Sequence, residues 1–267
     1  MVGIRKWFRK RDLLVLIGGV AIMQILVCMF VNRFMFYPVK GGYDKTLDGY
    51  IDIGTNGISV AARALGPFKG KKAILYCHGN AEDITSIDGR FDGLVGKGYT
   101  VVTVDYPGYG LSEGRPDEMG CYRNAHQLYD WLINVRGFSP KDIIVVGYSI
   151  GTGVATELAT SRDVGGLWLE AAFLSATRIV TRIRLLLVDP FPNCDRITNV
   201  KCPIVMLHGT SDSVVPYSHG RKLYKTVPQP KWFIPITGAD HTDFIDVLGR
   251  NKYEEILYSF VLNGHLN

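Results

Sequence analysis

The residues of this chain that could do chemistry begin with a serine between two glycines. The segment Gly147-Tyr148-Ser149-Ile150-Gly151 has the form G-x-S-x-G and follows an apolar, β-branched run that is typical of a buried strand. After a strand, this pattern is typical of a sharp turn into a helix that exposes a nucleophilic serine, with glycines where side chains would collide with neighbouring elements. The same residues also fit a glycine-rich packing turn, whereas the G-x-x-x-x-G-K-[ST] spacing of a phosphate-binding loop is missing.

A nucleophilic serine needs a histidine as its base and an acid that orients the histidine. Where a G-x-S-x-G turn carries such a set, the order along the chain is serine, acid, histidine. His241 lies in a loop directly after the apolar run KWFIPI, and Asp212 lies in a turn directly after the preceding apolar run. We therefore predict Ser149 as nucleophile, His241 as base and Asp212 as orienting acid. Asp240 and Asp243 are alternative acids, although direct neighbours of a histidine rarely point back at its ring.

The remaining histidines fit structural roles better. His208 ends an apolar run and is predicted to be structural, His219 is predicted to lie on a surface helix, and His265 lies close to the C-terminus. His78 precedes the serine, against the expected chain order, and is predicted to brace its own loop.

Acyl transfer also requires hydrogen-bond donors for the oxyanion that forms on the attacked carbonyl. In a G-x-S-x-G turn one donor is the backbone N–H of the residue after the serine, here Ile150, and the other comes from the loop after the third strand. That loop is CHGNAED, residues 77–83. In it we predict the N–H of Asn80 as the second donor, with that of Ala81 as the alternative.

Apolar runs that alternate with helical patterns must position these residues. Strands are predicted over 72–77, 99–106, 142–149, 166–173, 203–209 and 231–236, and helices over 84–97, 117–137, 150–161, 217–227 and 241–264. A hairpin is predicted within 50–65, and Asp117 is the predicted cap of the helix that starts there. This alternation predicts an α/β fold with a mostly parallel sheet and helices on both faces, in which functional groups gather beyond the carboxyl ends of the strands.

The composition is that of a folded globular domain without a nucleic-acid-binding surface. The chain has 267 residues, 47% of them hydrophobic, which is enough for a sizeable core. The net charge of +5 is concentrated at the N-terminus, where five basic residues stand against one acidic residue: Arg5, Lys6, Arg9, Lys10, Arg11 and Asp12. Because no basic patch with interleaved aromatic residues follows, we predict no nucleic-acid partner.

Residues 13–31 form a run without a single charge. As a helix this run would be about 28 Å long, close to the ~30 Å of a bilayer's hydrocarbon core. It is longer than the apolar part of a cleaved signal peptide, and no small-x-small cleavage site follows it. Val27 before Cys28 does not fit a lipoprotein signal, and a buried core helix would rarely lack charges on every face. We therefore predict an uncleaved signal anchor that binds the chain to the lipid bilayer.

The basic flank predicts the orientation of this anchor. The N-terminus would lie in the cytoplasm and the catalytic domain on the non-cytoplasmic side, which is the periplasm in a bacterium. The predicted organisation is a basic flank over 1–12, a single-pass anchor over 13–31, a linker over 32–48 and one α/β domain over 49–267. Between the sixth and seventh strands, about residues 173–200 leave room for only a small cap.

The cysteines do not form a recognisable pattern. Five are present, too sparse and irregular for a disulfide framework or a zinc site: Cys28, Cys77, Cys121, Cys194 and Cys202. A Cys194–Cys202 disulfide is conceivable in an oxidising compartment.

Taken together, the motifs resemble those of the α/β-hydrolase superfamily. The matching stretches are YCHGNAEDI, VVTVDYPGYGLSEGRPDEMG, VVGYSIGTGVATELA, LWLEAAF, CPIVMLHGTSDSVVPYSHGRKLY and TGADHTDF, in order over about residues 37–262. Within the superfamily the chain is similar to a small-cap, membrane-anchored group, the bud-emergence-like or serine aminopeptidase-like hydrolases, and to protein-depalmitoylating hydrolases. The resemblance implies the α/β-hydrolase fold and the triad Ser149, Asp212 and His241. LEAAF lacks the proline often seen after this glutamate, which leaves the cap's contacts open.

The resemblance and the anchor together imply a membrane-anchored serine hydrolase of carboxylesterase or thioesterase type. It would cleave an ester or thioester of an acyl or lipid-like substrate through an acyl-enzyme on Ser149, without a metal or organic cofactor. A serine peptidase or aminopeptidase, or an acyltransferase, could use the same triad. The alternative outside enzymes is a membrane-tethered interaction protein on an inactive hydrolase scaffold, which the intact triad and elbow glycines argue against.

Overall fold

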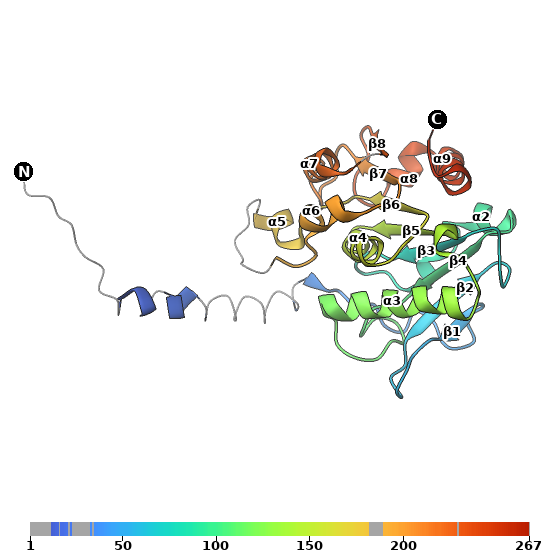
Figure 1. Ribbon diagram of the computed structural model, residues 1–267, viewed down its shortest axis with the longest axis horizontal. Helices are drawn as coiled ribbons and strands as arrows, with labels where there is room; N and C mark the ends of the chain where they lie inside the picture. Colours follow the sequence, from blue (N-terminus) through green and yellow to red (C-terminus); the bar gives the residue numbers. More distant parts are fainter. Residues whose placement is uncertain are drawn as a thin grey trace, which may run out of the picture.

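An eight-stranded sheet runs through the centre of the protein (Figure 1). The structure is a computed structural model that describes residues 12–15, 17–20, 22, 33, 35–181, 189–228 and 230–266. The strand order is β1 (Tyr50–Asp52), β2 (Ala61–Leu65), β4 (Thr100–Val104), β3 (Ala73–Cys77), β5 (Ile143–Tyr148), β6 (Gly166–Glu170), β7 (Ile204–Gly209) and β8 (Lys231–Ile236). β1 pairs antiparallel with β2, and β2 with β4, whereas every other pair is parallel. The predicted α/β class and the mostly parallel sheet are confirmed.

The five strands from β3 to β7 are buried along their whole length. Strands covered on both faces carry continuous apolar runs instead of an alternating pattern, and those runs are what the sequence shows there. β8 lies at one edge of the sheet and is only partly buried. The carboxyl ends of the parallel strands meet at one edge, which is where the predicted site residues follow them.

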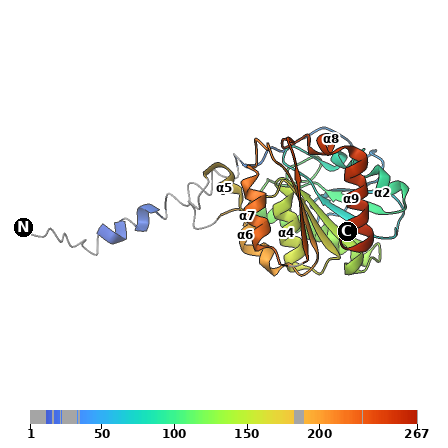
Figure 2. The same ribbon diagram turned by 90° about the horizontal axis from the view of Figure 1, so that it is seen from above.

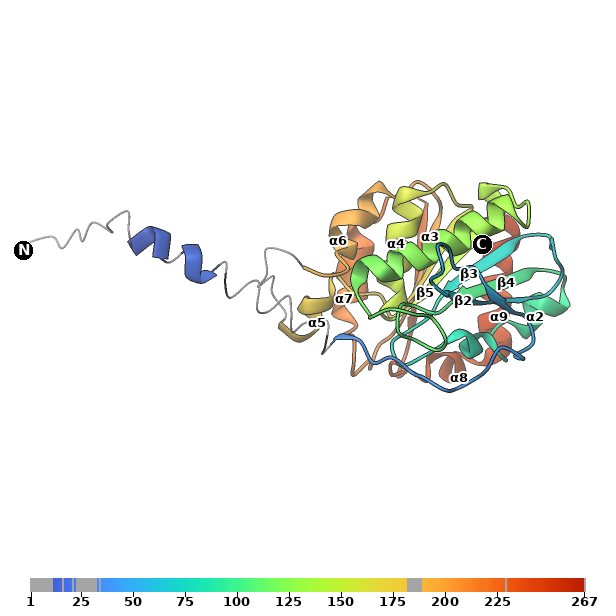
Figure 3. The same cartoon turned by 90° about the horizontal axis from the view of Figure 1, so that it is seen from below.

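Helices cover both faces of the sheet (Figures 2 and 3). One face packs against α3 (Glu118–Asn134), α4 (Gly151–Ser161), α6 (Asn193–Arg196) and α7 (Ser218–Thr226). The other face packs against α2 (Asp92–Gly96), α8 (Phe244–Leu248) and α9 (Arg250–Asn263). Each face therefore has its own hydrophobic cluster, with the sheet between them.

Two of the predicted helices are broken, so the predictions of one continuous helix there are wrong. The range 84–97 contains the 3₁₀ helix η1 (Ile84–Ile87) and α2, with Gly89 between them at a φ of +68°. The range 241–264 contains α8 and α9, with Gly249 between them at a φ of +86°. A positive φ is easy for glycine and interrupts a helix, which is the physical reason for both breaks.

Short helices lie between β6 and β7, over the range predicted for a cap. They are α5 (Ala176–Thr181), α6 and the 3₁₀ helix η3 (Ile197–Asn199), while residues 182–188 lie outside the described part of the chain. Cys194 and Cys202 are both free thiols, so the conceivable disulfide is not formed.

The predicted anchor over residues 13–31 falls mostly outside the described residues and stays a prediction. Among the residues that are described, no helix is long and apolar enough to cross a bilayer. Residues 35–39, within the predicted linker, pack against the rest of the molecule: Phe36 is 5% exposed, and the carbonyl of Val39 accepts the N–H of Gly110 at 2.7 Å.

Candidate active site

The turn between β5 and α4 holds Ser149 in a strained backbone conformation. Its φ is +51°, a left-handed value that is uncommon for a residue with a side chain. A Cβ on Gly147 would lie 2.6 Å from the carbonyl oxygen of Gly151, and one on Gly151 would lie 2.6 Å from the carbonyl oxygen of His78. Both glycines are therefore required for the close approach of β5, α4 and the loop after β3.

The structure brings Ser149, His241 and Asp212 together in one hydrogen-bonded row. Asp212 follows β7 and His241 follows β8, so the three residues come from the carboxyl ends of β5, β7 and β8. The Oγ of Ser149 lies 2.9 Å from Nε2 of His241, and Nδ1 of His241 lies 2.8 Å from Oδ2 of Asp212. With the proton of His241 on Nδ1, donated to the carboxylate, Nε2 is free to accept the proton of the serine hydroxyl.

The carboxyl of Asp212 is held in its ionised form. Burial alone would raise its pKa, but hydrogen bonds from His208, His241 and the backbone N–H of Val215 together hold the pKa well below its ordinary value. Asp212 is thus a hydrogen-bond acceptor throughout the neutral range. This is the state that fixes the tautomer of His241.

The two alternative acids fix the loop of His241 and do not contact its ring. Asp240 accepts the N–H groups of Ser213 and of His241 itself, each at 2.7 Å through Oδ1. Asp243 accepts the N–H of Asp240 at 2.7 Å. The loop that presents the base is therefore tied both to itself and to the turn that follows Asp212.

The two predicted oxyanion donors are available to an acceptor. Within the described residues, neither the backbone N–H of Ile150 nor that of Asn80 has a hydrogen-bond partner. The loop of Asn80 lies directly against the elbow, because the carbonyl groups of Cys77 and His78 are those that a Cβ on Gly151 would meet. The arrangement can therefore offer two N–H groups to a carbonyl oxygen on a substrate attacked by the serine.

Comparison with known proteins shows the family of this chain. A model of the alpha/beta hydrolase family matches residues 74–198. Human alpha/beta hydrolase domain-containing protein 17B is 31% identical over 200 residues, which cover 74% of this chain and 68% of that protein. This chain belongs to the alpha/beta hydrolase family. A putative alpha/beta hydrolase of Acanthamoeba polyphaga mimivirus is 29% identical over 248 residues, 89% of this chain and 92% of the viral one.

Other relatives are longer or share only the fold. This hydrolase spans 54% of mouse alpha/beta hydrolase domain-containing protein 17C, with 33% identity over 177 residues and 64% of its own length covered. Among solved structures, an esterase from Pyrococcus furiosus superposes with a TM-score of 0.68 at 17% identity, over 85% of this chain and 98% of that one. At that identity the likeness concerns the fold alone.

Tyr148, inside the G-x-S-x-G motif of this hydrolase, touches the loops of two site residues. Its hydroxyl donates to the carbonyl of His241 at 3.1 Å, and its ring centre lies 5.3 Å from that of His241. A Cβ on Gly79, next to Asn80, would lie only 2.7 Å from the same tyrosine ring. In the motif this position can be any residue, so the sequence predicts neither contact.

Behind Tyr148 lies a buried ion pair that the sequence did not predict. Glu170 ends β6, accepts hydrogen bonds from Trp168 (2.8 Å) and Tyr253 (2.6 Å), and forms a salt bridge with Arg90. The backbone carbonyl of Glu170 accepts the N–H of Ser149 at 3.0 Å. A charged residue at the end of an otherwise apolar strand was the available signal for this contact.

The loop of Asn80 is braced from both sides. His78 is buried, stacks on Tyr106 at 4.1 Å between ring centres, and donates from Nδ1 to the carbonyl of Gly79 at 2.8 Å. It braces its own loop, as predicted. The N–H of Gly79 in turn donates to the carboxylate of Glu82 at 2.6 Å, which also accepts the hydroxyl of Tyr76 at 3.0 Å.

Two more histidines lie near Asp212. Nε2 of His208 is 2.9 Å from the carbonyl of Val215 and 3.4 Å from Oδ2 of Asp212, so its proton is on Nε2 and the ring supports the acid. This buried histidine is structural, as predicted, but its contact with Asp212 was missed. His219 is only 5% exposed, so its prediction as a surface residue is wrong. It lies where α7 packs on the sheet, and burial lowers the pKa of its ring.

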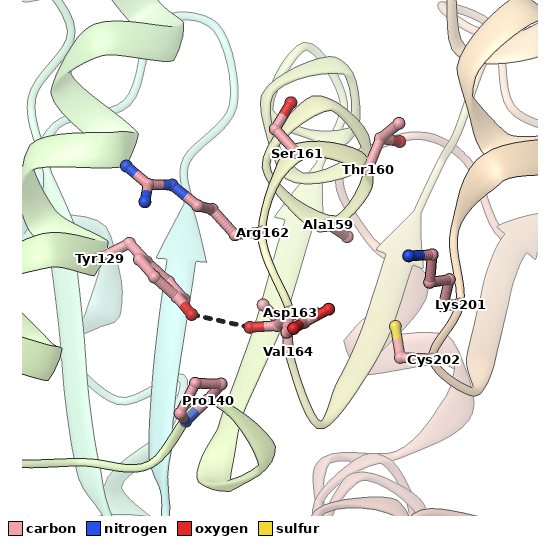
Figure 4. Close-up of a pocket in the computed structure, with 10 residues that line it drawn as sticks. All are labelled: Tyr129, Pro140, Ala159, Thr160, Ser161, Arg162, Asp163, Val164, Lys201 and Cys202. Atoms are coloured by element: carbon pink, nitrogen blue, oxygen red, sulfur yellow. Dashed lines mark hydrogen bonds between the residues drawn. The ribbon is translucent and has the colours of Figure 1, made fainter.

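A separate cavity of about 420 Å³ lies at the amino ends of the strands, on the side of the sheet away from the triad. It is lined by the end of α4 and by Lys201 and Cys202 before β7 (Figure 4). The hydroxyl of Tyr129 donates to the carbonyl of Asp163 there, at 2.7 Å. None of the predicted site residues lines it. Nowhere in the described part of the chain are three His, Cys, Asp or Glu side chains grouped to hold a metal ion.

Proposed function

We propose that this α/β hydrolase is a membrane-anchored serine hydrolase that cleaves an ester or thioester of an acyl or lipid-like substrate. The observation that supports it most is the row from Ser149 through His241 to Asp212, with distances of 2.9 Å and 2.8 Å. A non-catalytic scaffold would not need a strained serine turn, an ionised buried acid and two unbonded N–H groups at one place.

The first step is the acylation of Ser149. Nε2 of His241 takes the hydroxyl proton while Oγ attacks the carbonyl carbon of the substrate, and the imidazolium that forms is stabilised by Asp212. The negative charge on the carbonyl oxygen is stabilised by the N–H groups of Ile150 and Asn80. His241 then gives its proton to the leaving alcohol or thiol, and the acyl group remains on Ser149.

The second step is hydrolysis of the acyl-enzyme. A water molecule gives a proton to Nε2 of His241 and attacks the acyl carbonyl, whose oxygen again lies at the N–H groups of Ile150 and Asn80. Collapse of this intermediate returns the proton to Oγ of Ser149 and releases the acid. Side chains, backbone N–H groups and water supply every group that these two steps require.

The preference for an acyl or lipid-like substrate rests on the apolar run over residues 13–31. An anchor there keeps the catalytic domain beside the bilayer, on the non-cytoplasmic side, where such substrates are concentrated. A serine peptidase or an acyltransferase would use the same triad. A panel of acyl esters, acyl thioesters and aminoacyl amides distinguishes the three by the ratio of their kcat/KM values.

Covalent labelling with a fluorophosphonate probe tests the nucleophile. We expect the full-length protein to be labelled and Ser149→Ala to be unlabelled, with ester hydrolysis at least about ten-thousand-fold slower. Ser161→Ala is the matched control, because Ser161 ends the same helix and its hydroxyl bonds, among the described residues, only to Glu157, at 2.8 Å. A folded wild-type protein that takes no label would overturn the proposal.

A further inference from the structure

Residues 35–39, which we call the strap, lie across the loop that carries Asn80. Figure 3 shows the strap beside α5 of the cap region. Phe36 is 5% exposed and packs edge-on against Phe191, with 6.1 Å between ring centres. The strap is thus held at Phe36 by an apolar contact with Phe191, which lies between β6 and β7.

Asn80 binds the main chain of the strap with both ends of its side-chain amide. Its Nδ2 donates to the carbonyl of Met35 at 2.6 Å, and its Oδ1 accepts the N–H of Tyr37 at 2.9 Å. The pair of bonds has the donor-and-acceptor form of a strand ladder. The two bonds restrain the side-chain torsions of Asn80.

Tyr109 joins the same cluster from the loop after β4. Its hydroxyl donates to Oδ1 of Asn80 at 2.6 Å and accepts the N–H of Tyr37 at 3.2 Å. One residue on, Gly110 donates to the carbonyl of Val39 at 2.7 Å. The strap, the loop of Asn80 and the loop after β4 are therefore connected at one point.

These contacts do more than cover an apolar surface. The side chain of Tyr37 is largely exposed, yet its backbone N–H lies within hydrogen-bond distance of two acceptors. The polar contacts of the strap are made by its main chain, and those of Met35 and Tyr37 meet at the side chain of Asn80. The backbone N–H of Asn80, the proposed oxyanion donor, has no partner within the described residues.

We propose that the strap is a positioning element of the active site, which holds the N–H of Asn80 in place through the Asn80 side chain. The inference rests on the proposed function, because it assigns a cause to the placement of one oxyanion donor. A donor must lie about 2.7–3.1 Å from the oxyanion, so a small rotation of Asn80 weakens stabilisation of the transition state while substrate binding persists. The strap therefore acts on kcat and leaves KM largely unchanged.

Tyr109→Phe in the full-length protein tests this role. The substitution keeps the ring and removes only the hydroxyl that connects Asn80 with Tyr37. We expect kcat for an acyl ester to fall about tenfold, less than the hundredfold or more for complete loss of a donor, with KM within about twofold. Fluorophosphonate labelling should slow in parallel, because the phosphonyl oxygen occupies the same donors.

Tyr129→Phe is the matched control. Like Tyr109→Phe, it removes one tyrosine hydroxyl. That hydroxyl donates to the main-chain carbonyl of Asp163 at 2.7 Å, at the amino ends of the strands and far from the triad (Figure 4). We expect it to change the melting temperature by a similar amount and to leave kcat unchanged. If Tyr109→Phe and Asn80→Asp both keep the wild-type kcat, the strap has no positioning role and the proposed function still stands.

Asn80→Asp keeps the test decisive if Tyr109→Phe fails to fold. The carboxylate keeps an acceptor for Tyr37 but places an oxygen opposite the carbonyl of Met35, in the place of a donor 2.6 Å away. We expect a lower kcat with a normal melting profile, and a wild-type kcat here would overturn the inference. If the wild-type protein itself neither hydrolyses esters nor takes the label, the proposed function fails and the inference fails with it.

Discussion

Because Gly151 has no Cβ, the turn can hold Ser149 in position. A Cβ there would meet the carbonyl oxygens of Cys77 and His78, which belong to backbone that is paired and buried. Backbone cannot move aside as the end of a side chain can. The glycine is therefore a requirement of packing at the site as well as of the turn.

Gly151→Ala should destabilise the protein by about 1–3 kcal/mol, because overpacking against fixed backbone forces the elbow away from the loop of Asn80. It should also lower fluorophosphonate labelling of the part that stays folded. Urea unfolding at neutral pH measures the first effect, and the rate of labelling measures the second.

Gly96→Ala is the control for this substitution. Gly96 lies in α2, and a Cβ there meets nothing within 4 Å. Replacing a helical glycine by alanine should be neutral or stabilise by up to about 1 kcal/mol. Equal losses in the two variants would show that the contact at Gly151 is not the cause.

Residue by residue, the sequence could predict the triad because its members obey a fixed chain order and each follows its own apolar run. Ser149, Asp212 and His241 needed no knowledge of packing. The contacts of Tyr148 and His208 could not be predicted in this way. Each depends on which elements become neighbours across the sheet, and no local spacing encodes that.

Among the elements, the loop after β4 is joined to three other segments through Asp105. One carboxylate oxygen of Asp105 accepts the N–H of Ile84 at 2.9 Å, and the other accepts the hydroxyl of Tyr43. Its backbone carbonyl accepts from Asn124 on α3 at 2.8 Å. Burial, opposed in part by His78 and by the hydrogen bond from Tyr43, raises the pKa of Asp105 to about 6.

This raised pKa predicts a dependence of stability on pH. In the unfolded chain the carboxyl has a pKa of about 3.9, so the folded state holds its proton more tightly. Stability should therefore fall as the pH rises from about 4 to about 6, and this contribution should be constant above that. Asp105→Asn removes the titration.

Urea unfolding of the wild type and of Asp105→Asn across this range checks the prediction. The difference in unfolding free energy, wild type minus variant, should decrease between about pH 4 and about pH 6. A difference that stays flat, or that increases, would contradict the assigned cause.

The helices show where a local pattern suffices and where it does not. The start of α3 could be predicted from Asp117, whose carboxylate accepts the N–H of Gly120 at 2.7 Å, because a cap is a contact between near neighbours. The breaks at Gly89 and Gly249 could not, because hydrophobic spacing continues across both. Only the fold decides which of the many glycines in the chain takes a positive φ.

For the molecule as a whole, the mostly parallel sheet with helices on both faces could be predicted, while the position of the strap could not. Residues 32–48 have the composition of a linker, yet the strap within them is packed on the site. From Val31, the last residue of the apolar run, to Met35 the chain has four residue steps. These span at most about 14 Å in any conformation.

The proposed orientation can be tested with fusions after the C-terminus. Because the basic flank precedes the apolar run, we expect alkaline phosphatase fused there to be active and green fluorescent protein fused there to be dark in bacterial cells. Deleting residues 13–31 should reverse both results. A bright fluorescent fusion to the full-length chain would place the catalytic domain in the cytoplasm.

The position of Tyr148 has a consequence for how the motif is used in searching and in redesign. Its hydroxyl bonds to the loop of the base, and its ring packs on the loop of the proposed oxyanion donor. In the pattern G-x-S-x-G this position can be any residue, but in this hydrolase its side chain contacts two loops of the site. A library that varies position 148 to alter substrate selectivity would displace His241 and the proposed oxyanion donor together. Inactive variants from such a library would therefore carry no information about the substrate pocket.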